Sequence, residues 1–315
     1  MIKKASLSIL LIMSASLYVF SNNASDSASI FTKSNSNQLK ILTWNIYMLP
    51  YCSLVHGNCK RARMIADQLS GSDYDIIVFQ EAFNLRARSI LRRKLKQSFP
   101  NMYGPANMPL FSFRFNSGVW IISKVPLDKI EEIEYNHRCG MDAFARKGAV
   151  MFEGNWNGQI FQLVGTHLNS DGPDSIRHGQ CMEMTNKILK KHYKEQVPQI
   201  VCGDFNIETA DQANYHYMIN TLEAENGDFS GNIQTSFDEI DNSLAKRENG
   251  RKQMIDYVLI RNSKFFQSVK RKIAVRRAPE HHRFKDLSDH YGVEAILEFS
   301  GINEISSRVP IAAGN

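Results

Sequence analysis

Acidic, amide and imidazole side chains border several apolar, strand-like runs of this 315-residue sequence. Asn45, Glu81 and Asp204 each lie near the end of such a run, and Asp256 and His290 lie in two later ones. Because strand ends meet in a crevice at the edge of a sheet, we expect these side chains to gather at one rim. Together they are suited to metal-assisted cleavage of a phosphodiester. The six runs are TWNIYMLP, DIIVFQEAF, LVGTHLNSD, IVCGDFN, MIDYVLI and LSDHYGV.

Phosphodiester hydrolysis needs a base for the attacking water. His290 is the candidate, because a neutral imidazole accepts a proton near neutral pH. Asp256 and Asp289 could each serve as its partner carboxylate, and the residues alone do not separate the two roles. Glu81 is the first candidate for a metal ligand, with the neutral oxygen of Asn45 beside it. A strand-end carboxylate on the surface is the alternative interpretation of Glu81.

Four further side chains could bind the phosphoryl group. Asp204 and Asn206 are two residues apart, so on an extended backbone both would point to one face. An Asx-type turn is the alternative there. His167 could donate to a non-bridging oxygen, or it could be a histidine of the core. Lys147, five residues after Asp142, could neutralise phosphate charge, or it could form a surface ion pair of little energetic value.

The ordered set of motifs resembles the endonuclease/exonuclease/phosphatase superfamily from about residue 39 to residue 299. The segment CGMDAFARKGAV, residues 139–150, is similar to sphingomyelinases, which carry a comparable Asp, a Lys five residues later and a following Gly. The resemblance implies an α/β (α+β) fold, in which two packed mixed β-sheets flanked by helices form a four-layered sandwich. The alternation of strand and helix signals agrees with this fold, although it leaves other α+β folds open.

The resemblance also implies roles. It assigns Glu81 and Asn45 to a metal site, Asp256 to orienting the histidine, and Asp289 to the metal or its hydration shell. The expected cofactor is Mg²⁺, with Mn²⁺ or Co²⁺ as other possible divalent cations. The expected reaction is hydrolysis of sphingomyelin to ceramide and phosphocholine by water attack. The expected catalytic residues are His290, Asp256, His167, Asp204, Asn206 and Lys147.

The expected partner is a choline phospholipid in a membrane, reached by peripheral contact. Bacterial sphingomyelinases often carry an aromatic-tipped hairpin before the final Ser-Asp-His motif. Here residues 271–289 are instead basic and His-rich, so electrostatic attachment to anionic headgroups is an alternative way to dock. The competing functions are a secreted Mg-dependent nuclease of the same fold, for which nucleic acid would be the partner, and an inactive binding module.

The N-terminus predicts export. Two lysines precede a short apolar stretch and then small residues, which is typical of a secretory signal peptide over residues 1–24. A Ser- and Asn-rich stretch predicts a flexible leader over residues 25–38. A single catalytic domain is expected over residues 39–300, with a tail at 301–315. The formal charge of +6 favours an anionic partner without choosing between polymer and membrane.

Five cysteines bear on the redox state of an exported chain. Cys52 and Cys59 flank a short loop, so a local disulfide between them is plausible. Cys202 lies in an apolar run and is expected to be a buried thiol. Cys139 and Cys181 then remain as a second candidate pair.

Periodicity and turn signals predict the main elements. Helices are expected over residues 60–70, 84–99 and 175–193, and the second of these is strongly basic. Asn157 and Gly158 predict a hairpin turn. Strands are expected over residues 40–47, 75–80, 119–122, 149–153, 159–166, 199–202, 255–260, 272–275 and 292–298.

Overall fold

The computed structural model describes residues 37–50, 56–108, 113–281 and 283–300, which lie in one compact unit. The expected signal peptide, most of the expected leader and the expected tail lie outside the described residues. The limits of the catalytic domain therefore stay predictions. In the described part of the chain, no helix has the length and apolar character needed to cross a membrane.

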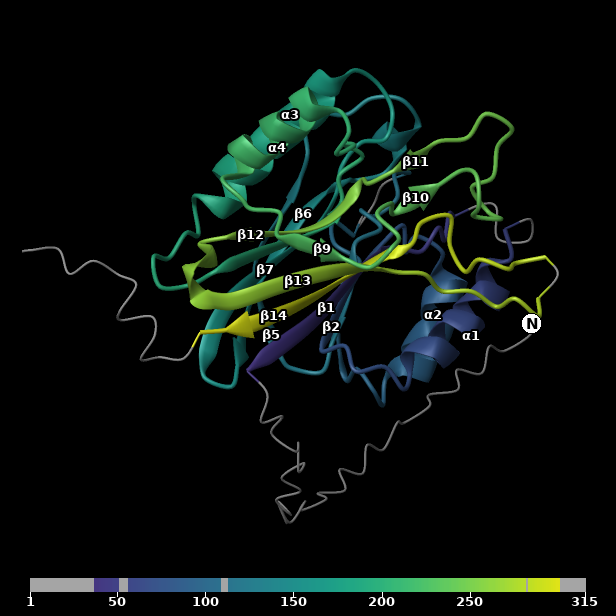
Figure 1. Ribbon diagram of the computed structural model, residues 1–315, viewed down its shortest axis with the longest axis horizontal. Helices are drawn as coiled ribbons and strands as arrows, with labels where there is room; N and C mark the ends of the chain where they lie inside the picture. Colours follow the sequence, from purple (N-terminus) through teal and green to yellow (C-terminus); the bar gives the residue numbers. More distant parts are fainter. Residues whose placement is uncertain (1–36, 51–55, 109–112, 282, 301–315) are drawn as a thin grey trace, which may run out of the picture. The chain divides into compact units, whose positions relative to one another are not determined.

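Two mixed sheets form the centre of the structure (Figure 1). The larger sheet has the strand order β3-β4-β2-β1-β14-β13-β9, and the smaller has the order β12-β8-β7-β6-β5. The strands of the larger sheet are β1 (Gln38–Asn45), β2 (Ile76–Gln80), β3 (Asn101–Tyr103), β4 (Trp120–Ser123), β9 (Asp228–Ser230), β13 (Phe266–Ala274) and β14 (Gly292–Phe299). Those of the smaller are β5 (Leu127–Glu134), β6 (Gly148–Trp156), β7 (Gln159–His167), β8 (Gln199–Asp204) and β12 (Asp256–Arg261). A separate pair is formed by β10 (Phe237–Asp238) and β11 (Lys252–Gln253).

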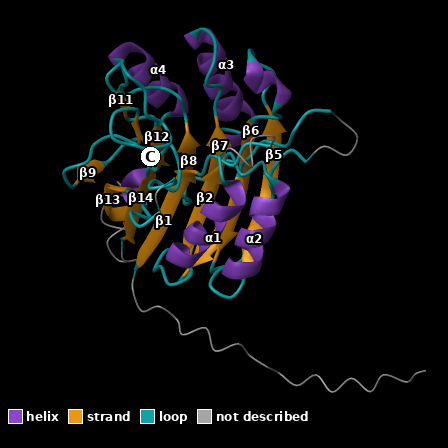
Figure 2. Cartoon of the chain, turned by 90° about the vertical axis from the view of Figure 1, so that its right-hand side faces the viewer, coloured by secondary structure: helices purple, strands orange, loops and turns teal. Residues whose placement is uncertain are grey.

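Helices cover the outer faces of the two sheets, so the structure has four layers (Figure 2). The larger sheet packs against α1 (Asn58–Leu69) and α2 (Leu85–Leu95). The smaller sheet packs against α3 (Asp174–Met184), α4 (Gln212–Leu222) and the π-helical turn η2 (Thr185–Leu189). Two short 3₁₀ helices, η1 (Met141–Phe144) and η3 (Ser263–Phe265), lie in loops. The expected four-layered sandwich is confirmed.

Strand β2 shows how the sequence produces these layers. Ile76 and Val78 belong to the core between the sheets, whereas Ile77 and Phe79 belong to the core beneath α1 and α2. Successive side chains of a strand point to opposite faces, so a strand covered on both faces needs an unbroken apolar run. This requirement explains why residues 75–80 could be identified as a strand from the sequence.

Most expected elements are present, with shifted ends. The basic helix is α2, capped by the Asn84 side chain, which accepts a hydrogen bond from the Ala87 amide at 3.0 Å. The expected hairpin joins β6 to β7, with Asn157 and Gly158 at positive φ. The long helix expected over 175–193 is instead α3 followed by the wider π-helical turn η2, in which the Lys190 amide bonds the Thr185 carbonyl. Sequence analysis did not anticipate β5 or the short strands β3, β9, β10 and β11.

Strand pairing brings the site-bearing ends together. β1 is parallel to β2 and ends at Asn45. β7 is parallel to β8, with His167 opposite Asp204. β12 is antiparallel to β8 and starts with Asp256 opposite Asp204, while β14 is antiparallel to β1 and starts just after His290. The Asn45 amide donates to the Asp204 carboxylate at 3.0 Å, which joins the rims of the two sheets.

The described cysteines are free thiols. The expected disulfide between Cys139 and Cys181 is wrong. Cys181 is buried in the core, whereas the Cys139 thiol donates to the Asp171 carbonyl at 3.2 Å. Cys202 is buried, as expected. Cys52 lies outside the described residues, and its expected partner Cys59 is a free thiol.

Arg61 is a fully buried cation that ties the rim loops to α1. Its guanidinium donates to the carbonyls of His56, Ile46 and Leu287, each at 2.8 Å, and to the carbonyl of Tyr47. Burial lowers the pKa of Arg61 to about 10, so the side chain stays charged at neutral pH. One side chain thus holds the loop after β1 against the segment that precedes Asp289.

We expect Arg61→Met to lower the free energy of unfolding by about 3 kcal/mol or more, because several buried carbonyls would lose a charged donor. Arg63→Met is the matched control, since Arg63 lies on the same helix with an exposed side chain. That control should change stability by no more than about 0.5 kcal/mol. Denaturant unfolding of both variants measures the difference, and equal stabilities would contradict the assigned role of Arg61.

Candidate active site

A hydrogen-bonded histidine occupies the centre of the rim. The Nδ1 atom of His290 is 2.9 Å from Oδ2 of Asp256, and both side chains are buried. Nε2 of His290 faces Oδ2 of Asp204 at 3.8 Å, which is too long for a direct hydrogen bond. Asp256 therefore fixes the ring orientation, and Nε2 is the nitrogen available to exchange a proton with a bound water or substrate.

Charge at this histidine is set by its neighbours. Burial by itself lowers the pKa of His290, but the carboxylates of Asp256 and Asp204 outweigh it and raise the pKa well above the ordinary value. The ring is held further by its backbone, since the Trp44 indole donates to the His290 carbonyl at 2.9 Å. The arrangement therefore raises the proton affinity of His290, so the neutral ring is a strong proton acceptor at Nε2.

Two buried carboxylates close to this histidine, Glu81 and Asp289, have raised pKa values. Glu81 follows β2 with a φ of 54°, which is uncommon for a residue with a side chain. Burial, then the charge of Asp289, raises the pKa of Glu81 to about 7. Burial also raises the pKa of Asp289. Among the described residues, the buried Oε2 of Glu81 has no hydrogen-bond partner.

An unsatisfied buried carboxylate oxygen beside a second carboxylate fits a hard divalent cation. Glu81 and Asp289 could hold Mg²⁺ through their carboxylate oxygens. The side-chain oxygen of Asn45 accepts from the Tyr47 amide at 3.1 Å, and its amide nitrogen donates to Asp204. Asn45 thus lies at the same rim, as expected, and has carboxylate and backbone partners there.

A second place for a cation is offered by Asp204, Asp256 and His290. One ligand atom from each of these residues lies within 4.8 Å of the others. However, Asp256 and His290 already use Oδ2 and Nδ1 in their mutual hydrogen bond. Because the same carboxylates favour a proton on His290, the chemistry of this trio suits proton transfer better than metal ligation.

Lys147 lies inside the rim rather than on the surface, since its side chain is only 4% exposed. Its ammonium group is 2.8 Å from Asp142, 3.0 Å from Nε2 of His167 and 2.9 Å from the Leu168 carbonyl. Burial opposes ionisation of Asp142, yet the charge of Lys147 outweighs it and lowers the pKa of Asp142 to about 2. The surface ion pair considered for Lys147 is therefore wrong.

His167 is a neutral imidazole in this setting. Burial and the adjacent Lys147 lower the pKa of His167 to about 3. The Lys147 ammonium can only donate, so Nε2 of His167 must accept and the remaining proton lies on Nδ1. In the described structure this buried Nδ1 has no partner. His167 can therefore donate a hydrogen bond without carrying charge.

Asp204 and Asn206 do not form the extended pair that their spacing predicted. The Asn206 amide donates to Oδ1 of Asp204 at 3.0 Å, and Asn206 has a φ of 52°. This is the Asx-type turn named as the alternative. The turn directs the Asn206 side chain to the Leu168 carbonyl at 3.1 Å, which is also bonded by Lys147. Asn206 therefore lies with the Lys147 group.

All nine expected site residues are thus brought to one rim. Sequence analysis missed the side chains that hold the final motif in place. The Ser288 hydroxyl donates to the Asn45 carbonyl at 2.6 Å. The Asn242 amide donates to the carbonyls of Ser288 and Asp289 at 2.9 and 3.1 Å. Ser288 could have been suspected from its place in the motif, whereas Asn242 lies in a loop without any sequence signal.

Glu81→Gln should abolish the stabilisation of the protein by added Mg²⁺, because a ligand that binds only the folded state raises its stability. Without metal, the variant should be at least as stable as the parent, since the repulsion between Glu81 and Asp289 is removed. Thermal unfolding with Mg²⁺ and with chelator tests both points. Glu195→Gln, which changes an exposed carboxylate, is the control. An unchanged Mg²⁺ shift in Glu81→Gln would rule out this ligand.

Comparison with known proteins yields relatives over most of the chain. "Sphingomyelinase C 2" of Leptospira interrogans is 29% identical over 273 residues, which is 79% of this chain and 43% of that protein. The chain thus spans less than half the length of this relative. "Sphingomyelinase C" of Bacillus cereus is 27% identical over 303 residues, with 83% of this chain and 89% of the relative covered.

The fold has solved counterparts. A β toxin variant of Staphylococcus aureus with bound magnesium ions superimposes with a TM-score of 0.73 at 23% identity, covering 84% of this chain and all of that one. At this identity the match supports the fold alone. Residues 42–290 match the model of a single protein family, which covers more than half of the sequence. The chain belongs to the Endonuclease/Exonuclease/phosphatase family.

Proposed function

We propose that this protein is a Mg-dependent phosphodiesterase that hydrolyses sphingomyelin to ceramide and phosphocholine. The observation that carries the proposal is the position of His290 in the rim. It is oriented by Asp256 and faces Asp204, and it is close enough to the Glu81 and Asp289 carboxylates to interact with their charges. The Lys147 ammonium interacts with Glu81 in the same way. A base, a place for a cation and hydrogen-bond donors for a phosphoryl group therefore occur together.

In the proposed reaction, Nε2 of His290 takes the proton of the attacking water, and Asp256 stabilises the imidazolium that results. Asp204 accepts a hydrogen bond from this water and orients it. The Lys147 ammonium, which lies against the neutral His167 beside Asp204, would donate to a phosphoryl oxygen and balance the growing negative charge. Mg²⁺ held by Glu81 and Asp289, with Asn45 at the same rim, would polarise the phosphoryl group as a Lewis acid.

Lipid rather than nucleic acid is favoured as the substrate. Both relatives described above bear the name sphingomyelinase C. The segment that resembles sphingomyelinases also contributes directly to the rim, since it supplies the buried pair of Asp142 and Lys147. The phosphoryl chemistry itself does not distinguish the two substrates, so a nuclease is the alternative that the experiment below tests.

The proposal includes peripheral membrane contact through the loops beside the site. Leu85, Phe113, Met141 and Phe144 are 73%, 105%, 76% and 57% exposed. The Phe115 amide donates to the Phe144 carbonyl at 2.9 Å, so the loops of residues 113–117 and 143–146 lie side by side. Exposed large apolar side chains in neighbouring loops are typical of an interaction surface. Here they would enter the lipid interface.

Export is proposed on the basis of residues 1–24 alone. The features that support it are the two N-terminal lysines and the short apolar stretch after them. The protein would then meet lipid from outside the cytoplasm, either as a secreted or as a periplasmic enzyme.

Purified protein should release phosphocholine from sphingomyelin vesicles in Mg²⁺ and not in chelator. Phosphatidylcholine vesicles and plasmid DNA, offered in parallel, should stay intact. His290→Ala should lower the rate by roughly 10²–10⁴-fold, because a positioned base contributes that much, while circular dichroism stays unchanged. Nicking of DNA without release of phosphocholine would replace the proposed function with the nuclease alternative.

Phe113→Ala combined with Phe144→Ala should weaken binding to sphingomyelin vesicles at least tenfold, since each side chain contributes about 1.5–3 kcal/mol when fully removed from water. Hydrolysis of a soluble phosphodiester substrate should be unaffected. Ile160→Ala is the control, because Ile160 is exposed in the hairpin at the opposite end of the sheet. Vesicle sedimentation measures binding, and unchanged binding of the double variant would exclude these loops as the contact.

A further inference from the structure

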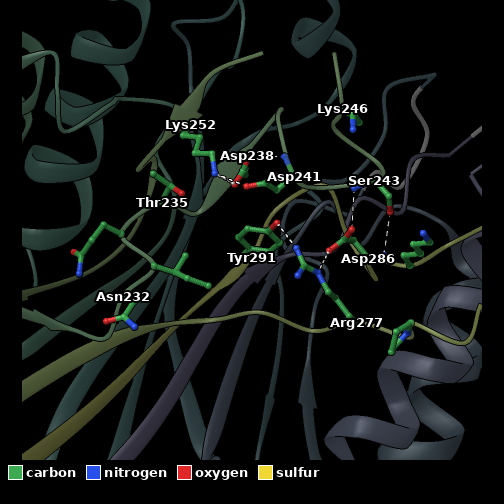
Figure 3. Close-up of a pocket in the computed structure, with 14 residues that line it drawn as sticks. Asn232, Thr235, Asp238, Asp241, Ser243, Lys246, Lys252, Arg277, Asp286 and Tyr291 are labelled. Carbon is green, nitrogen blue, oxygen red and sulfur yellow. Dashed lines mark hydrogen bonds and ion pairs between the residues drawn. The ribbon is translucent and has the colours of Figure 1, made fainter. Parts of the chain in front are cut away.

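A cavity of about 760 Å³, most of whose lining residues are polar or charged, lies behind the loop that carries His290. Figure 3 shows Tyr291 in its middle, with Asp238 and Lys252 on one side and Arg277 and Asp286 on the other. One wall comes from the segment that carries β10, and the other comes from the basic segment before the Ser-Asp-His motif. None of the proposed catalytic residues lines this cavity, so it is a separate candidate site.

The carboxylates of this cavity are already paired. Asp286 lies 2.7 Å from Nε of Arg277 and accepts from the Ser243 amide at 2.8 Å. Asp238 lies 3.1 Å from the Lys252 ammonium, which also contacts Asp241. These internal ion pairs leave the acidic side chains with little capacity to bind a further cation.

Two lysines of the same cavity have no such partners. Lys246 and Lys285 are both exposed, and no ion pair of either is found within the part of the chain that the structure describes. Ser243 can donate its hydroxyl, since its oxygen accepts from the Asp286 amide at 3.1 Å. Two free ammonium groups and a hydroxyl donor in one concave surface suit a phosphate, which accepts several charged hydrogen bonds.

An exposed apolar side chain also lines the cavity. Ile233 is 42% exposed there, next to the polar residues Asn232 and Gln234. An apolar side chain contributes nothing to the binding of free phosphate. It can contribute to the binding of a lipid headgroup, because lysines next to an apolar side chain match the boundary between phosphates and acyl chains in a bilayer.

The cavity is connected to the catalytic loop by short contacts. The Tyr291 amide donates to the Ser236 carbonyl at 2.6 Å, and Phe237 forms a backbone bridge with His290. Asn242 donates to the carbonyls of Ser288 and Asp289 from the same segment. A ligand bound in the cavity would therefore contact the segment that supports the loop carrying His290.

We propose that this cavity binds the phosphate headgroup of an anionic phospholipid in the same membrane, separate from the lipid that is cleaved. This inference rests on the proposed function, because it takes a lipid bilayer as the surface on which the enzyme works. The headgroup phosphate is bound by Lys246 and Lys285, and Ile233 contacts the lipid beside it. Anionic lipid thereby increases attachment and holds the catalytic loop against its support.

The test measures attachment without turnover. Protein in chelator is mixed with vesicles of phosphatidylcholine alone and with vesicles that also contain phosphatidylserine, and the bound fraction is determined by sedimentation. The parent should bind the anionic vesicles more tightly. Lys246→Gln with Lys285→Gln should remove this gain, by roughly fivefold for each lysine. The matched control, Lys96→Gln with Lys270→Gln, changes two other exposed lysines and should retain most of it.

Three outcomes decide the proposal. Equal loss in both double variants would overturn it, because attachment would then depend on net charge and not on this cavity. The proposal would be supported if inorganic phosphate displaced the parent from anionic vesicles but did not displace the double variant Lys246→Gln with Lys285→Gln. Calorimetric binding of inorganic phosphate at the two lysines, with vesicle attachment unchanged in their variant, would overturn the lipid assignment. Since this test measures no hydrolysis, its result can be interpreted even if the proposed catalytic function is wrong.

Discussion

Repulsion between buried carboxylates is the constraint on which this structure depends. Glu81, Asp204, Asp256 and Asp289 share one rim, where little water screens them. Buried charges of one sign are costly unless cations or protons balance them. Arg61 and the proton favoured on His290 provide part of that balance from within the chain. The negative charge that stays unbalanced is at Glu81, and a divalent cation bound there would balance it.

Strand pairing forces these charges together despite their separation in sequence. Two parallel pairs, β1 with β2 and β7 with β8, end at the same rim, and antiparallel β12 and β14 start there. Most residues of these strands are buried, so a shift of register would expose apolar side chains. The energy that holds the carboxylates in place therefore comes from the two cores, and the active site adds strain that the cores must overcome.

Sequence reasoning succeeded where a feature is local and failed where it depends on distant contacts. The apolar run of β2 and the turn at Asn157 carry their own signals. Strand β5 is charged and lies at a sheet edge, so its pattern resembles a loop. In the sequence, Arg61 cannot be told from an arginine on a helix surface. Its burial depends on the carbonyls of Ile46 and Leu287, which are distant in the sequence. The turn at Asn206 depends on a backbone angle that spacing does not reveal.

The two histidines of the rim illustrate this limit and explain how one site can contain both a base and a donor. Burial, with the adjacent ammonium group of Lys147, lowers the pKa of His167 to about 3. His290 is beside two carboxylates, and its pKa rises. Identical side chains thus acquire opposite proton affinities from their neighbours, and such differences separate a base from a neutral group. The chemistry therefore depends on Lys147 and Asp256 as much as on the two imidazoles.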